Sequence, residues 1–172
     1  MVELVKQNFE KNKMEFETNK AEILRWLGSD VKVDHVGSTA IPDMVGKNII
    51  DILVGANDSF EFEKFKMIIS CKGFYASPNS ANEFYQFFAS RQGETGDGDV
   101  HIHLVIMGTA RYDEFLILRD YLLRHKEEAD GYLNHKKELI SSGVTDRKLY
   151  RATKSKYVSE LIARAKKEVG YE

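Results

Sequence analysis

The sequence has little cysteine and little proline, and it has no long apolar run. It contains one cysteine and two prolines among 172 residues, and no stretch approaches the roughly 18 apolar residues of a membrane span. A single cysteine excludes an internal disulfide and a cysteine-rich zinc site, and it is typical of a reducing compartment. We interpret Cys71 as a small buried residue at a helix end. Because the amino terminus also lacks the apolar core of a signal peptide, we expect a cytoplasmic protein.

An excess of charge of one sign is also absent. Lys and Arg total 25 against 27 Asp and Glu, which gives a formal net charge of -2. This balance provides no general attraction to nucleic acid or to anionic membranes, so any phosphate site must be local. The chain is 42% hydrophobic and 30% charged, which is ordinary for a folded protein. Its length predicts one domain over residues 1–172.

The spacing of apolar residues predicts strands in the middle of the chain and helices on both sides. Helical spacing occurs at 2–27, at 60–69 and in three segments after Gly108. Strand patterns occur at 31–37, 48–55, 83–90 and 100–107. We expect the last two strands to pair antiparallel, and the segment 38–47 to be a loop or a short helix. Strands grouped in this way predict an α+β fold.

The most informative stretch covers residues 35–54. Gly37, Ser38 and Thr39 follow a predicted strand, and Asp51 lies within the next, apolar one. A Gly-Ser turn lets the backbone approach a polyphosphate, with amide and hydroxyl groups as donors. A carboxylate in an apolar strand costs free energy unless it meets a cation or donors, so Asp51 is a candidate metal ligand. The alternative is a structural carboxylate that accepts hydrogen bonds from the neighbouring loop.

Three polar residues alternate along the last predicted strand. Asp99, His101 and His103 are spaced by two, so their side chains should point to one face of the sheet. Two imidazoles beside an acid favour a metal site or acid–base chemistry, and imidazole prefers Zn²⁺ or Mn²⁺ to Mg²⁺. A histidine on a strand is otherwise usually structural. His35 is a weaker candidate, with a core histidine bonded to the backbone as the alternative.

Positive charge gathers late in the chain. On a helix Arg147, Arg151 and Lys154 lie on one face, which continues into an apolar stripe. Lys154 therefore points toward the body of the protein and is a candidate ligand for phosphate or carboxylate. The alternative is a solvated lysine whose stem alone is buried. Lys47 and Arg91, each beside a predicted sheet end, are secondary candidates for phosphate binding.

Several motifs together resemble the GrpB family. They are HVGSTAIPDMVGKNIIDILV at 35–54, HIHLV at 101–105, RDYLLRHKEEADGYLNHKKEL at 119–139, and YRATKSKYV, which contains Lys154. The likeness covers essentially the whole chain. Because the family is similar to the polymerase-β-type nucleotidyltransferases, the resemblance implies a mixed sheet of about four to five strands flanked by helices, with a helical carboxy-terminal region.

One part of the nucleotidyltransferase pattern is missing. Those enzymes carry Asp-x-Asp or Asp-x-Glu on the strand that follows the Gly-Ser turn. If Asp51 takes the first position, the second falls on Leu53; if Asp51 takes the second, the first falls on Ile49. The His-x-His strand looks like the counterpart of the strand that carries a third carboxylate in those enzymes. A missing carboxylate argues against conventional two-magnesium transfer.

The resemblance implies a nucleotidyltransferase that binds a nucleoside triphosphate and acts on an acceptor that the sequence does not identify. The expected phosphate ligands are Gly37, Ser38, Thr39, Lys47, Arg91 and Lys154. The expected catalytic and metal-binding residues are Asp51, His101 and His103, with Mg²⁺, Mn²⁺ or Zn²⁺ as the metal. The alternatives are a non-catalytic nucleotide-binding module and a metal-dependent phosphohydrolase that uses the two histidines. In each case the expected partner is a nucleotide or another phosphorylated small molecule.

Overall fold

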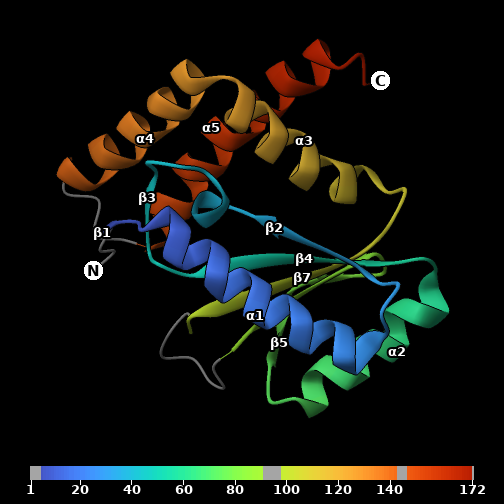
Figure 1. Cartoon of the computed structure of the whole chain (residues 1–172). Coiled ribbons are helices and arrows are strands. Elements are labelled where there is room, and N and C mark those ends of the chain that lie inside the picture. The colour runs from blue at the N-terminus through green and yellow to red at the C-terminus, as the bar shows by residue number, and fades with distance from the viewer. Residues whose placement is uncertain (1–4, 91–97, 143–146, 172) are drawn as a thin grey trace.

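A five-stranded mixed sheet forms the centre of the molecule (Figure 1). The computed structural model describes residues 5–90, 98–142 and 147–171, apart from the side chains of residues 147, 148, 150 and 151. The strands lie in the order β2-β4-β7-β6-β5. They are β2 (Lys32–Val36), β4 (Ile50–Ala56), β5 (Tyr75–Asn82), β6 (Tyr85–Ala89) and β7 (Val100–Ile106). Only the β4–β7 pair is parallel among these, so the predicted α+β fold with a mixed sheet is confirmed.

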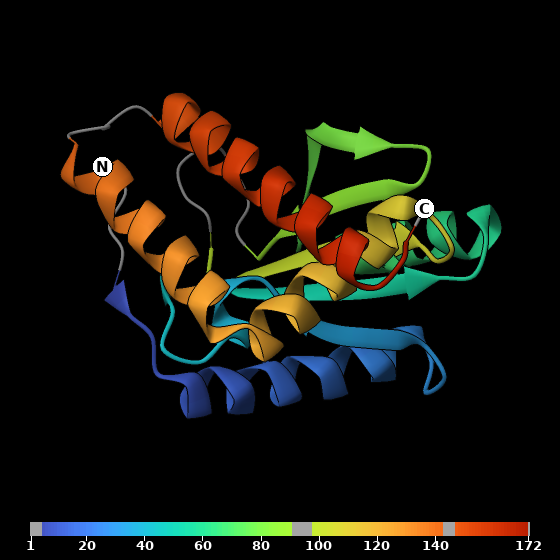
Figure 2. The same ribbon diagram turned by 90° about the horizontal axis from the view of Figure 1, so that it is seen from above.

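Helices cover both faces of this sheet (Figure 2). The helices are α1 (Phe9–Leu27), α2 (Ser59–Cys71), α3 (Ala110–Arg124), α4 (Lys126–Ser141) and α5 (Arg147–Glu168). The first two pack on one face through the main apolar core, and α3 packs on the other face. A further apolar cluster joins α3, α4 and α5 to one another. The three helices predicted after Gly108 are therefore confirmed, and among the described residues no helix has the length and apolarity to cross a membrane.

The first helix is shorter than the sequence predicts. Asn8 caps it, because its side chain accepts a hydrogen bond from the Lys11 amide at 3.0 Å and so satisfies a free helical donor. Gly28 ends the helix with φ 126°. The residues before the cap are not helical: β1 (Val5–Lys6) pairs with β3 (Val45–Gly46) in a separate two-stranded sheet. The rest of the predicted loop contains the 3-10 helix η1 (Ser38–Ala40).

Strand β4 divides its side chains between two faces of the sheet. Ile50, Ile52 and Val54 enter the core beneath α1 and α2, so Asp51 and Leu53 face α3, because strand side chains alternate. The parallel register pairs Asp51 with His101 and Leu53 with His103. Strand β4 thereby brings the carboxylate and both imidazoles to one face, as the sequence predicts.

Two expectations are wrong in detail. The apolar spacing predicts no strand at β5. This strand is mostly exposed and carries Pro78 at the sheet edge, where proline is tolerated. Cys71 is exposed rather than buried. It lies two residues beyond Ile69, which is the last residue of α2 to face the core, and two helical residues turn the side chain to the opposite side.

Candidate functional site

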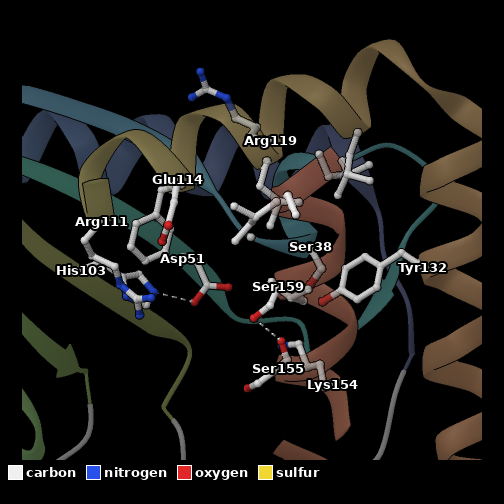
Figure 3. A pocket seen from close by; sticks show the side chains of 18 of the residues that line it. Ser38, Asp51, His103, Arg111, Glu114, Arg119, Tyr132, Lys154, Ser155 and Ser159 are labelled. Atoms are coloured by element: carbon white, nitrogen blue, oxygen red, sulfur yellow. Dashed lines mark hydrogen bonds and ion pairs between the residues drawn. The ribbon is translucent and has the colours of Figure 1, made fainter. Parts of the chain in front are cut away.

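A cavity of about 630 Å³ lies between the sheet, α3 and α5 (Figure 3). The turn after β2 and the strands β4 and β7 form one wall, α3 and α5 form the other walls, and α4 contributes a tyrosine. The principal polar side chains that line it are Ser38, Asp51, His103, Arg111, Glu114, Arg119, Tyr132, Lys154, Ser155, Ser159 and Lys166. Segments far apart in the sequence therefore meet at one hollow.

The Gly-Ser turn reaches the cavity because Gly37 has no side chain. Its backbone, at φ 73° and ψ -168°, lies in a region that essentially only glycine adopts. A Cβ atom at this position would come within 2.3 Å of Asp51 Oδ2. Strand pairing sets Val36 opposite Asp51, so the turn follows directly beside the carboxylate. Ser38 then starts η1 and lines the cavity.

Asp51 is held by both histidines of β7. Its Oδ1 atom is 3.1 Å from His101 Nδ1 and 3.5 Å from His103 Nε2, and its side chain is 24% exposed. Burial favours the protonated acid, but the hydrogen bonds from His101 and His103, together with their charge, hold the pKa of Asp51 below its usual range. Asp51 is therefore a carboxylate at neutral pH.

Tyr85 extends this cluster. Its hydroxyl lies 2.9 Å from His103 Nδ1, while the opposite ring nitrogen faces Asp51. If His103 is neutral and donates from Nε2 to Asp51, its Nδ1 accepts from the Tyr85 hydroxyl, and every partner is satisfied. The result is a chain of hydrogen bonds from Tyr85 through His103 to Asp51.

The predicted metal site has the expected residues but a different arrangement. Among the described residues, no group of three or more His, Cys, Asp or Glu side chains is placed to hold a metal ion. In His101 and His103 the ring nitrogens nearest Asp51 are engaged with its carboxylate, whereas a metal would need their lone pairs. As placed, the three side chains form a hydrogen-bonded cluster rather than a ligand set. A bound metal stays a prediction.

A lysine of α5 lies at the opposite end of the cavity from His103, and a buried lysine of α4 lies behind the cavity wall there. Lys154 of α5 lines it beside Ser155 and Ser159 (Figure 3). Lys136 of α4 is 2% exposed, and its Nζ donates to the Val45 carbonyl at 3.1 Å. Burial, with a smaller contribution from the charge of Lys154, lowers the pKa of Lys136 to about 7, against the opposing effect of Asp51.

Lys136 was not among the predicted site residues, although the sequence contains a signal for it. The buried residues of α4 are Ala129, Tyr132, Lys136 and Leu139, which recur at helical spacing. A lysine inside such an apolar stripe marks a charge that faces the interior. Arg111 and Glu114 on α3 were not predicted either, and no comparable sequence pattern distinguishes them from surface charges.

Arg111 and Glu114 stand at the His103 end of the cavity. The Arg111 guanidinium lies 5.0 Å from the centre of the Tyr85 ring and 5.2 Å from that of Phe115, a cation–π arrangement. Glu114 forms an ion pair with Lys166 of α5 at 2.8 Å. This pair joins the two helical walls.

Several predicted residues do not line the cavity. Thr39 is 1% exposed, and its hydroxyl lies 2.9 Å from His35 Nε2. The His35 ring stacks on Phe16, and burial lowers its pKa to about 4, so it is a neutral core histidine. The alternative predicted from the sequence, a core histidine, is right in its burial but wrong in its partner: the ring bonds to the Thr39 side chain, whereas a bond to the backbone was expected. Lys47 is partly buried away from the lining.

The remaining predicted residues fall into three groups. His101 stands behind Asp51 without lining the cavity itself. Asp99 is exposed and accepts a hydrogen bond from the Ser90 hydroxyl at 2.7 Å, so it does not join the histidines. Arg91 and the side chains of Arg147 and Arg151 lie outside the described residues.

Comparison with known proteins identifies relatives along most of the chain. A family model described as GrpB protein matches residues 2–164. A UPF0157 protein of Streptomyces coelicolor is 29% identical over 147 residues, which is 86% of this chain and 75% of the relative. A UPF0157 protein of Pseudomonas aeruginosa is 31% identical over 133 residues, covering 77% of this chain and 54% of the relative. The chain thus spans about half the length of the Pseudomonas protein.

Solved structures share the fold. The conserved protein GrpB from Enterococcus faecalis superposes with a TM-score of 0.82 at 20% identity, covering 97% of this chain and 99% of that one. A Cid1 poly(U) polymerase mutant bound to MgATP superposes with a TM-score of 0.53 at 12% identity, covering 80% of this chain and 44% of the polymerase. A cytoplasmic RNA terminal U-transferase gives 0.53 at 13% identity, with 83% and 43% covered. These polymerases show a nucleotidyltransferase-like fold, and this chain spans less than half of each.

Proposed function

The chain belongs to the GrpB family, and we propose that its cavity binds a nucleoside triphosphate, from which the protein transfers a nucleotidyl group to an acceptor. One observation carries the proposal: Ser38, Asp51, His103 and Lys154 come from four separate elements and line one cavity. A nucleotidyltransferase-like fold places a Gly-Ser turn and a strand carboxylate side by side here. The Cid1 enzymes bind nucleotides on such a fold, which supports the proposal without extending their substrates to this chain.

The polyphosphate is proposed to lie between the Gly-Ser turn and α5. The Ser38 hydroxyl can donate to a phosphate oxygen, and the Lys154 ammonium supplies positive charge from the opposite wall (Figure 3). Ser155 and Ser159 add hydroxyl groups on the same helix face. Charge-assisted hydrogen bonds from fixed groups favour an anion in a partly buried cavity.

The Asp51 cluster is proposed to serve the reacting end. An acceptor oxygen would attack the α-phosphorus, and pyrophosphate would leave. The acceptor proton would reach His103 Nδ1 by way of the Tyr85 hydroxyl, which gives its own proton to the ring and takes up that of the acceptor. Because its pKa is held low, Asp51 stays ionised and stabilises an imidazolium beside it. Tyr85 fixes the ring of His103 through its hydroxyl.

A specific observation favours a second candidate, a nucleotide-binding module without catalysis. If Asp51 takes the first carboxylate position, the second falls on Leu53, which is buried in one cluster with Val36, Val105 and Tyr112. If Asp51 takes the second, the first falls on Ile49, which is also buried. The second acid of a two-metal enzyme is thus replaced by a core residue. Binding needs no second acid, whereas two-metal transfer does.

A thermal-shift panel tests binding. Nucleoside triphosphates should be added alone and with Mg²⁺, Mn²⁺ or Zn²⁺. A ligand at about 100 times its dissociation constant stabilises by roughly 2.7 kcal/mol, and each kcal/mol shifts the melting temperature by about 2–4 °C in a chain of this size. Lys154→Met should lose the shift. Lys156→Met, at an exposed position on the same helix, is the matched control.

The reaction is tested separately by its products. Release of pyrophosphate with a labelled acceptor supports nucleotidyl transfer, and release of inorganic phosphate supports the phosphohydrolase that the histidines suggested. Binding with no product favours the non-catalytic module. A complete panel without any shift would remove the proposed function.

A further inference from the structure

Lys136 is a buried lysine without an ion-pair partner among the residues that the structure describes. Its side chain crosses from α4 to β3, where Nζ donates to the Val45 carbonyl at 3.1 Å, and it stands 4.4 Å from the centre of the Tyr132 ring. Within the described part of the chain, no Asp or Glu forms an ion pair with it. A buried ammonium without a counter-charge is costly, so the position requires either a neutral amine or an anion.

The surroundings of Lys136 adjoin the phosphate end of the cavity. Val45 precedes Gly46, and a Cβ atom at Gly46 would lie 2.7 Å from the Ser38 hydroxyl oxygen. Tyr132, over which Lys136 lies, lines the cavity itself, as does Lys154. Lys136 does not itself line the cavity, but it contacts Tyr132, which does.

We propose that Lys136 is a second cation of this ligand site, and that it takes up one proton when a polyanionic ligand binds in the cavity. The inference rests on the proposed function, since it needs a phosphorylated ligand in the cavity. The inference adds Lys136 to the ligand site, and it makes the affinity for the ligand depend on the uptake of a proton.

The charges that face Lys136 set the sign of the effect. From α5 comes the ammonium of Lys154, from β4 the carboxylate of Asp51, from its own helix the Tyr132 ring, and from β3 the Val45 carbonyl. Burial and Lys154 outweigh Asp51 and lower the pKa of Lys136 from 10.5 to about 7. Without ligand the amine is mostly neutral above pH 7. A bound polyphosphate supplies negative charge to both lysines and raises this pKa again.

The affinity should therefore depend on pH in a defined window. Below about pH 7 Lys136 is already protonated, and binding takes up no proton there. Above it, binding must bring a proton from solvent, so affinity falls as pH rises, by up to about tenfold per pH unit, the limit for one linked proton. A lysine that only ties α4 to β3 as a neutral amine predicts no such dependence.

Isothermal titration calorimetry in buffers of different ionisation enthalpy counts the protons directly. Inorganic triphosphate and ATP are the probes, and the wild type is compared with Lys136→Met at pH 8 and pH 6. The subtraction removes protonation of the ligand itself. We expect the wild type to take up close to one proton more than the variant at pH 8, and the difference to fall toward zero at pH 6.

Two further variants keep the test informative if Lys136→Met folds poorly. Lys136→Arg holds a permanent charge and should bind without the extra proton. Lys137→Met, at an exposed neighbouring position, should behave as the wild type. Equal proton counts in wild type, Lys136→Met and Lys136→Arg would overturn the inference while leaving nucleotide binding intact. Failure of the wild type to bind either probe would instead overturn the proposed function.

Discussion

Single residues in and around the cavity carry charges that burial makes costly, and some of these charges are compensated by partners while others are not. Asp51 is stabilised by two imidazoles. Arg119 is paired with Asp34 at 3.1 Å and with Asp120 at 2.7 Å, and in Figure 3 it turns away from the other labelled side chains. Lys154 faces the cavity with no ion-pair partner among the described residues. The charge of Lys154 is thus available to the proposed phosphate.

Asp51→Asn separates a ligand role from a structural role. We expect nucleotide affinity in the presence of a divalent metal to fall by at least about tenfold, as loss of a charged interaction worth about 1.5–3 kcal/mol implies. Affinity in EDTA should stay the same or rise, because a negative charge beside the phosphate is removed. Calorimetric titration and a melting curve on the same sample measure both properties. Unchanged affinity with a lower melting temperature would show a purely structural acceptor.

His35 should make the fold sensitive to mild acid. Its pKa is lowered from 6.5 to about 4, so between these values the unfolded chain binds a proton that the folded protein excludes. Stability therefore falls as pH drops from 6.5 toward 4, by at most about 3.4 kcal/mol at 1.36 kcal/mol per pKa unit.

Urea unfolding of wild type and His35→Gln across this range checks the expectation. The amide keeps a partner for Thr39 but does not titrate, so the variant should lose less stability on acidification. His125→Gln, which replaces a histidine outside the cavity, is the control. Parallel pH curves for wild type and His35→Gln would contradict the assignment.

At the scale of elements, sequence periodicity predicts the helices and strands that pack an apolar face against the core. Strands β2, β4, β6 and β7 and all five helices were predicted, because each buries a regular apolar face. Strand β5 buries little and contains Pro78 and polar residues, so no such signal marks it. The pair of β1 and β3 has two residues per strand, too few for alternation to be visible.

The same distinction explains which site residues the sequence could reveal. Asp51 and the histidines stand out because polar side chains interrupt apolar strands, and Ser38 because of the glycine before it. Their proximity depends on the parallel register of β4 and β7, which alternation alone does not fix. Arg111 reaches the cavity because of the way α3 packs, and the residues next to it in the sequence do not indicate this packing.

The turn between β2 and η1 should not tolerate a side chain. In Gly37→Ala the Cβ atom meets Asp51 within 2.3 Å and the backbone is held in a glycine-only region, so we expect a loss of more than about 3 kcal/mol together with weaker nucleotide binding. Denaturant unfolding and calorimetric titration measure the two effects.

Gly73→Ala provides the matched control for backbone strain. Gly73 also has positive φ, at 89°, but nothing lies within 4 Å of its Cβ position. It should cost about 1–2 kcal/mol and leave ligand affinity unchanged. Equal losses in both variants would show that contact with Asp51 is not what requires glycine at position 37.

At the scale of the whole molecule, the cavity lies at the seam between the sheet and the carboxy-terminal helices. Ion pairs join the helices on this side of the cavity: Lys166 of α5 with Glu114 of α3, and Arg164 of α5 with Glu128 of α4 at 3.0 Å. The opposite layer of α1 and α2 does not line the cavity. A ligand in the cavity would therefore contact both the sheet and α5, which the chain connects through α3 and α4.

Hydrogen exchange should map this bridging. On addition of ATP, we expect slower exchange in peptides from η1 and from residues 152–163 of α5, because bound ligand suppresses local opening of both walls. Peptides from α2 (59–71) should not change. Protection spread evenly over both layers would point to global stabilisation or to binding elsewhere.

Because β4 pairs in parallel with β7, the site forms late in folding. The bond between Asp51 and His101 spans 50 residues, with α2 and the β5–β6 pair between them, and non-local pairing of this kind forms slowly. Lys154 can join only after α5 docks on the completed sheet. A ligand that recognises all these groups has no partner in the folding transition state, so it should leave the refolding rate unchanged and slow the unfolding rate alone. In a chevron plot, only the unfolding arm would move, and nucleotide would protect the protein by prolonging the life of each folded molecule.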